Sequence, residues 1–227
     1  MDTQLGFGRT LVLAPHPDDE VLGAGGTLAR LAAEGQSVFA AIVTQGRQPE
    51  FSHDSVERVK AEAAEAHRAL GVEETFWLGM PAASLGEVGH SALNAAISKV
   101  VRHVAPQTLL LPFVGDIHVD HQLTFLSGLV ASRPHQTEFP KFVLAYETVS
   151  ETNWNAPFLS PAFTPNIFVD ISAHLETKLA AIKCYSSQLR SPPHERSLAN
   201  LQALACVRGA TVIREAAEGF VLVRAVL

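Results

Sequence analysis

The side chains best suited to chemistry lie between Pro15 and Glu20, where a histidine and three consecutive carboxylates follow an apolar run. Prolines on both sides of His16 restrict the backbone, so its imidazole is presented from a stiff turn at the end of a predicted strand. A catalytic zinc takes three protein ligands from histidines and carboxylates and leaves a fourth position for water. The turn therefore predicts one half of a metal site.

The other half is predicted in the segment 115–122, which holds two aspartates and two further histidines, His118 and His121. Alone, the spacing of these histidines is a weak signal, because such pairs occur by chance. Combined with the proline-braced turn, they favour a metal site over coincidence.

Together the two segments supply a complete ligand set for zinc, formed by His16, Asp19 and His121. Asp18 then stands beside the metal without being needed as a ligand, and His118 lies across the same site, one helical turn before His121. Iron, manganese or cobalt could take the place of zinc, because ligands of these types do not select one metal.

The elements that must bring these segments together are predicted as alternating strands and helices. Strands are predicted at 10–14, 37–44, 74–78, 108–113, 142–146, 167–171 and 219–226, and helices at 21–34, 54–70, 91–104, 122–132, 173–189 and 198–207. Right-handed crossovers make this an α/β fold, a Rossmann-like three-layer αβα sandwich with a mostly parallel sheet. Both charged segments follow strands, which places them at the same carboxyl edge.

Length and composition indicate an ordinary globular protein, with 227 residues and 47% hydrophobic content, and a single domain over residues 1–227 is expected. A formal charge of -6 without a lysine or arginine run argues against nucleic acid and membrane partners. Signal peptide and membrane-spanning patterns are absent from the sequence. Two cysteines without metal spacing, Cys184 and Cys206, predict buried thiols in a reducing compartment. We therefore expect a cytoplasmic protein with a small-molecule substrate, and leave a homo-oligomer open.

The segments Ala14–Glu20 and His118–His121 resemble motifs of the PIG-L/LmbE family of zinc-dependent de-N-acetylases, over about two-thirds of the chain by motif order. This resemblance implies zinc ligands at His16, Asp19 and His121, a general base at Asp18, an oxyanion stabiliser and acid at His118, and Asp120 as partner of His118. Amide hydrolysis at neutral pH needs these roles, because water is a poor nucleophile and the tetrahedral intermediate carries negative charge.

The substrate that the resemblance implies is an N-acetylated amino sugar or its conjugate. Two departures bear on this substrate: Arg47 stands where many members have Glu, and the segment 78–82 lacks an acidic residue that some sugar deacetylases carry. Arg47, Arg190 and His194 are the candidate substrate-binding residues. The segment 146–154 has the aromatic and hydroxyl content of a sugar site, although an ordinary loop has the same composition.

Two other functions compete with this one. The resemblance extends to a zinc hydratase acting on a small dicarboxylic acid, which needs cationic clamps such as Arg47. The glycines of the segment 23–26 suggest a non-catalytic nucleotide-binding module, but the third glycine of that fingerprint is replaced by Leu28, so helix packing explains them better.

Ordinary structural roles are expected for the remaining polar residues near the motifs. Glu20 is interpreted as a carboxylate at a helix start and Asp116 as a loop cap. The histidines interpreted as ordinary surface or core residues are His53, His67, His90, His103, His135 and His174.

Overall fold

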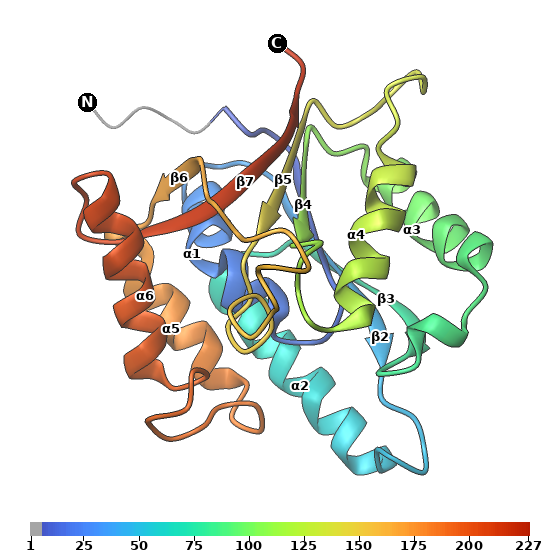
Figure 1. Ribbon diagram of the computed structural model, residues 1–227, viewed down its shortest axis with the longest axis horizontal. Coiled ribbons are helices and arrows are strands. Elements are labelled where there is room, and N and C mark those ends of the chain that lie inside the picture. The colour runs from blue at the N-terminus through green and yellow to red at the C-terminus, as the bar shows by residue number, and fades with distance from the viewer. Residues whose placement is uncertain (1–5) are drawn as a thin grey trace.

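The computed structural model describes residues 6–227. The N-terminal segment in which no signal peptide was expected begins outside this range. Seven strands form one sheet in the order β3-β2-β1-β4-β5-β7-β6, with helices on both faces (Figure 1). The strands are β1 (Thr10–Ala14), β2 (Val38–Gln45), β3 (Glu74–Pro81), β4 (Thr108–Pro112), β5 (Phe142–Tyr146), β6 (Ile167–Asp170) and β7 (Ala217–Ala225). The helices are α1 (Asp19–Ala33), α2 (His53–Leu70), α3 (His90–Val104), α4 (Val119–Ala131), α5 (Leu175–Cys184) and α6 (Leu198–Thr211).

The first five strands are parallel, and β7 runs antiparallel to both of its neighbours, β5 and β6. The predicted α/β class with a mostly parallel sheet is therefore confirmed. Strand β1 lies in the middle, paired with β2 on one side and β4 on the other. Because β1 and β4 are parallel neighbours, the charged segments that follow them meet at one edge of the sheet.

Each face of the sheet carries its own apolar core. On one face, Val12 packs in a cluster with Leu28 of α1 and with residues of α2, α5 and α6. On the other face, Leu11 and Leu13 join a cluster that includes Ile97 of α3 and residues of α4. Alternate side chains of the fully buried β1 thus enter opposite layers, which explains the continuous apolar run in its sequence.

Helix α1 approaches the sheet closely because glycines line its inner side. A Cβ atom at Gly23 would lie 2.1 Å from the ring of Tyr146, and one at Gly26 would lie 2.6 Å from the side chain of Ile171. This close contact supports the expected packing role of the glycines in the segment 23–26.

Some predicted boundaries and burials were wrong. Helix α4 begins at Val119 instead of 122, because the Nδ1 atom of His118 accepts the backbone N–H of Asp120 and caps the helix. Helix α5 ends at Cys184 instead of 189, because the backbone of Tyr185 is not helical and its side chain packs in the core. Cys184 is partly exposed and Cys206 is exposed, so the prediction of buried thiols was also wrong.

The helices within residues 6–227 are too short or too polar to cross a bilayer. None of them combines the length and apolar character that a membrane span requires.

Candidate metal centre and catalytic cavity

The turn after β1 is held by its own polar groups. The backbone N–H of His16 donates to Oδ2 of Asp19 at 2.8 Å. The carbonyl of Pro15 accepts bonds from both the N–H and the hydroxyl of Thr44, at 3.0 and 2.8 Å, which ties the turn to the end of β2. The predicted stiffness of this turn thus comes from three hydrogen bonds as well as from its prolines.

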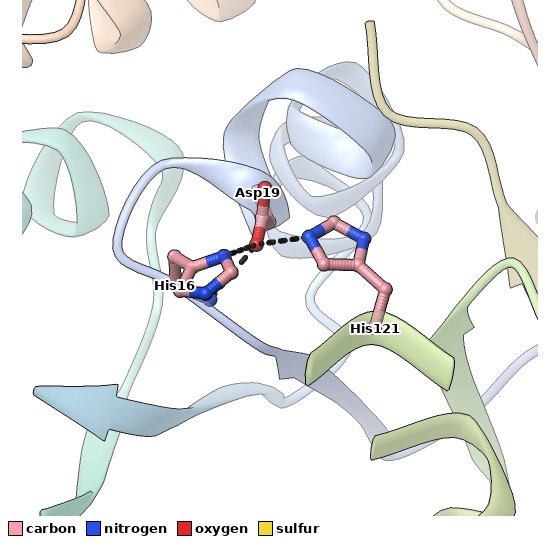
Figure 2. Close-up of side chains that lie close together, drawn as sticks. All are labelled: His16, Asp19 and His121. Atoms are coloured by element: carbon pink, nitrogen blue, oxygen red, sulfur yellow. Dashed lines mark hydrogen bonds and ion pairs between the residues drawn. The ribbon is translucent and has the colours of Figure 1, made fainter. Parts of the chain in front are cut away.

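His16, Asp19 and His121 lie together as the sequence predicts, with the carboxylate between the two imidazoles (Figure 2). Oδ2 of Asp19 lies 3.3 Å from Nδ1 of His16 and 3.3 Å from Nε2 of His121. One donor atom from each residue falls within 4.8 Å of the others. Asp19 comes from the start of α1 and His121 from the first turn of α4, so the adjacent strands β1 and β4 bring the set together.

Two ligand atoms of this set are buried without a hydrogen bond among the described residues: Oδ1 of Asp19, and Nε2 of His121, whose contact with Asp19 is the ion pair at 3.3 Å. Unpaired buried polar atoms are costly, and they are rare in native proteins unless a ligand or ion satisfies them. Two imidazoles and a carboxylate match the donor set of a catalytic zinc site. The residues present therefore fit a zinc ion.

Asp116 orients one of the imidazoles. Its Oδ2 atom lies 2.8 Å from Nδ1 of His121, and its Oδ1 atom accepts the Thr152 hydroxyl at 2.6 Å. Carboxylates behind metal-binding histidines fix the ring and its tautomer in this way. The expected loop-cap role missed this contact, although Asp116 stands in the same charged segment as His121.

The ligand groups shift one another's pKa values. Burial alone would lower the pKa of His121, but Asp19 and Asp116 outweigh it and raise that pKa to about 10. Burial likewise opposes the bonds from Asp120 and Asp19 that raise the pKa of His16 to about 9. The pKa of Asp19 stays well below its usual range despite burial, because both imidazoles favour its charged form. The contacts thus favour positively charged imidazoles at His16 and His121 beside a negatively charged carboxylate at Asp19.

Asp18 lies beside the triad and does not belong to it. Burial raises the pKa of Asp18 to about 8, against the opposing effect of Arg196. The guanidinium of Arg196 donates from Nη1 to Oδ2 of Asp18 at 2.9 Å, and its Nη2 atom lies 3.5 Å from Glu151. A pKa in this range suits a group that exchanges protons near neutral pH.

His118 packs edge-on against His16, with ring centroids 4.5 Å apart, and burial and the His16 charge lower the pKa of His118. Asp120 was expected to be the partner of His118. Its carboxylate instead lies 3.0 Å from Nε2 of His16 and accepts the N–H of Ala83, whereas its contact with His118 runs through its own backbone N–H.

A cavity of about 590 Å³ adjoins these groups. The candidate residues Asp18, His118 and His16 line it, as do Arg196 and Glu151. Its other walls carry the apolar side chains of Pro17, Phe51, Val56, Val59, Trp77, Ala82 and Ala83, together with polar residues of α2 and of the loop after α5. Most binding sites for small molecules have this mixture of apolar walls and a few polar groups.

The candidate substrate residues do not line this cavity. Arg47 donates to the carbonyl of Gly79, and Arg190 donates to the carbonyls of Ser187 and Leu189. His194 accepts the N–H of Arg196 and lies edge-on to Trp154, of which 54% is exposed. Arg196, two residues beyond His194, is the residue of that loop that reaches Asp18.

Comparison with known proteins agrees with this geometry. Residues 11–131, more than half of the chain, match the family described as PIG-L, GlcNAc-PI de-N-acetylase. The chain belongs to the PIG-L family. An uncharacterised deacetylase of Escherichia coli K12, YaiS, is 28% identical over 78% of this chain and 90% of its own.

Two further relatives extend the PIG-L comparison. The 1D-myo-inositol 2-acetamido-2-deoxy-alpha-D-glucopyranoside deacetylase of Mycobacteroides abscessus is 27% identical over 86% of this chain and 88% of its own. The crystal structure of a conserved protein of Thermus thermophilus superposes with a TM-score of 0.79 at 28% identity, covering 96% of both chains. Because the PIG-L family is described as a de-N-acetylase family, and both YaiS and the Mycobacteroides relative are named deacetylases, this chain is an enzyme that hydrolyses amides.

Proposed function

We propose that this PIG-L protein is a zinc-dependent hydrolase that removes the N-acetyl group from an amino sugar or an amino-sugar conjugate. The observation that carries the proposal is that Oδ1 of Asp19 and Nε2 of His121 are buried without a hydrogen bond, next to a cavity that Asp18 and His118 line. The family description and the Mycobacteroides relative both name acetylated glucosamine compounds, which supports the substrate class.

His16, Asp19 and His121 would hold the zinc, which when bound lowers the pKa of a water to about 7 and polarises a carbonyl. Asp18 takes the proton from water as the water attacks the amide carbon. His118 donates a hydrogen bond to the oxyanion that forms and then a proton to the nitrogen of the leaving amine, and the proton that Asp18 took from water restores His118. Asp120 acts on the metal-binding residues through His16, because the Asp120 carboxylate lies 3.0 Å from Nε2 of the His16 ring.

Arg196 has two roles in this proposal. Its bond to Asp18 orients the carboxylate and favours its charged, basic form. Its contacts with Ser150 and Glu151 hold the arginine itself in place, at 2.9 and 3.5 Å. Without Arg196 the pKa of the buried Asp18 carboxylate would be higher still, so the arginine widens the pH range in which Asp18 is charged and can act as a base.

The hydratase alternative gains no support from the site. Arg47, its expected carboxylate clamp, binds the Gly79 carbonyl and does not line the cavity. Arg196 does line the cavity, but its charge is already paired with Asp18 and Glu151.

Acetate release from matched substrates tests the proposed function. The zinc-loaded protein should deacetylate N-acetylglucosaminyl-inositol or a short chitin oligomer, and it should leave an N-acetyl amino acid intact. Hydrolysis of the amino acid alone would contradict the sugar assignment. Hydrolysis of none of them by protein with full zinc occupancy would contradict the reaction itself.

A further inference from the structure

The carboxylate of Glu20 belongs to a buried network that reaches the active site through the backbone. Its Oε2 atom accepts the N–H of Asp18 at 3.2 Å. Its Oε1 atom accepts the hydroxyl of Tyr185 at 2.6 Å and lies 3.0 Å from Nε2 of His67. All four residues are buried, so the carboxylate depends on these bonds for its stability.

The partners of Glu20 come from separate parts of the fold. His67 lies near the end of α2 and Tyr185 directly follows α5. Nδ1 of His67 lies 2.7 Å from the hydroxyl of Thr75 on β3. The consistent assignment has Nε2–H donating to Glu20 and Nδ1 accepting from Thr75. Three elements thus fix one carboxylate beside the catalytic turn.

The backbone of Asp18 needs such a constraint. Its φ of 116° and ψ of -28° lie in a region that residues other than glycine rarely adopt. A conformation of this kind persists only where surrounding bonds fix it, and it is common at functional sites. The bond from Glu20 holds the peptide plane before the N–Cα bond of Asp18, and helix α1 holds the chain after it, so together they limit φ and the direction in which the Asp18 side chain leaves the backbone.

We propose that Glu20 is a positioning residue for the general base, and that it fixes the Asp18 backbone so that the Asp18 carboxylate faces the cavity. This inference rests on the proposed function, because it requires Asp18 to be the base. Glu20 itself does not line the cavity, so it acts through Asp18 and not on the substrate. A capping carboxylate would also bind the N-cap N–H, but a cap alone does not need the buried donors Tyr185 and His67.

Glu20→Gln is the primary test. Whichever way the amide is oriented, its NH₂ group meets a donor, either the Asp18 N–H or the pair formed by Tyr185 and His67. We expect kcat for acetate release to fall by about 10- to 100-fold, because small misplacements of a reacting group cost this much. KM and the zinc affinity, measured by competition with a chelator, should stay at the wild-type values.

Two phenylalanine variants separate positioning from loss of stability. Tyr185→Phe removes one donor to Glu20 and should lower kcat by about 3- to 10-fold. Tyr146→Phe is the matched control, because its equally buried hydroxyl donates to the Leu13 carbonyl at 2.8 Å, and Tyr146 neither bonds to Glu20 nor lines the cavity. Both should lower Tm, whereas only Tyr185→Phe should lower kcat. Tyr185→Phe also keeps the proposal testable if Glu20→Gln does not fold.

Introducing Glu20→Gln into the Asp18→Asn variant tests whether Glu20 affects catalysis through Asp18 or independently of it. Once the base is absent, Glu20→Gln should cause no further loss of kcat, whereas an effect independent of Asp18 would add to the loss. A crystal structure of Glu20→Gln should show a changed φ at Asp18. Additive losses, unchanged kcat or reduced zinc affinity in Glu20→Gln would each overturn the positioning role. A wild-type rate in Asp18→Asn would instead contradict the proposed base.

Discussion

The carboxylate of Asp116 fixes the tautomer of His121 across a distance of 2.8 Å between Oδ2 and Nδ1. Because an ionised carboxylate only accepts hydrogen bonds, Asp116 keeps a proton on Nδ1, which leaves Nε2 as the ring atom available to a metal. Thr152 donates to the other oxygen of Asp116 and holds it in turn. The metal ligand is thus oriented before any metal binds.

We predict that Asp116→Ala weakens zinc binding by about 10- to 100-fold, the usual effect of removing a carboxylate behind a ligating histidine. Chelator competition measures this affinity. Asp170→Ala is the control, because that carboxylate on β6 binds Ser172 and Arg214 instead. Equal zinc affinities in the two variants would show that Asp116 does not orient the ligand.

The two histidines of the second motif should behave differently. His121→Ala removes a buried donor atom and should lose the zinc. His118→Ala should retain zinc but lose about 10²- to 10³-fold in kcat, as expected for an oxyanion donor. Metal analysis of both purified variants, with kinetics on the second, provides the check. Full zinc occupancy in His121→Ala contradicts the ligand assignment.

Substitutions of the adjacent residues Asp18 and Asp19 should also have different effects on zinc binding and on kcat. Asp18→Asn should keep the zinc and lose about 10²-fold or more in kcat, because it removes the proposed base. Asp19→Asn should weaken zinc binding, because its carboxylate lies between the two imidazoles. The prediction is wrong if Asp18→Asn loses zinc as completely as Asp19→Asn does.

The sequence predicted the fold and the clustering of His16, Asp19 and His121 because the relevant signals are local. The apolar runs of β1 and β4 indicate buried parallel strands, and the charged segment after each strand continues that signal. Parallel topology then places both segments at one edge, so that contact between Asp19 and His121 follows from short-range patterns and general rules of connection.

The supporting contacts could not be predicted in the same way. Arg196 reaches Asp18 across 178 positions of sequence, from a loop without periodicity or motif. Glu20 stands at a helix start, where a carboxylate is common for other reasons, so its buried bonds to Tyr185 and His67 leave no distinct pattern. Such contacts are properties of the packed tertiary structure.

Loss of one partner from a buried ion pair should strongly lower stability. Nζ of Lys178 lies 2.6 Å from Oε1 of Glu218 and donates to the Leu22 carbonyl at 2.8 Å. Glu218 also accepts the N–H groups of Gly26 and Thr27, at 2.9 and 2.7 Å, so the pair also binds the backbone of α1.

We predict that Lys178→Met lowers the free energy of unfolding by about 3–5 kcal/mol, because it leaves the Glu218 charge buried and unpaired. Urea denaturation measures the change. Lys183→Met on the same helix, at a more exposed position, is the control and should have little effect. A loss below about 1 kcal/mol in Lys178→Met would contradict the prediction.

The last prediction concerns pH and the loop after α5. Glu62 of α2 accepts bonds from the hydroxyls of Ser186 and Ser187, at 2.9 and 2.5 Å, and from Arg58 at 3.1 Å. Burial alone would raise the pKa of Glu62, but these bonds outweigh it and lower the pKa below its ordinary value of 4.5. The bonds therefore favour the charged form in the folded protein.

Because its pKa is lowered on folding, Glu62 contributes stability that is present above the unfolded pKa and lost as pH falls through the folded pKa. Glu62→Gln should therefore be less stable than wild type near neutral pH, and the difference should shrink as pH falls below about 4.5. Urea denaturation of chelator-treated proteins between about pH 3 and pH 7 tests this without a contribution from metal loss. Glu65→Gln, at an exposed position of the same helix, should show no comparable trend. A stability difference for Glu62→Gln that stays constant over this range would show that the charge of Glu62 does not hold the loop.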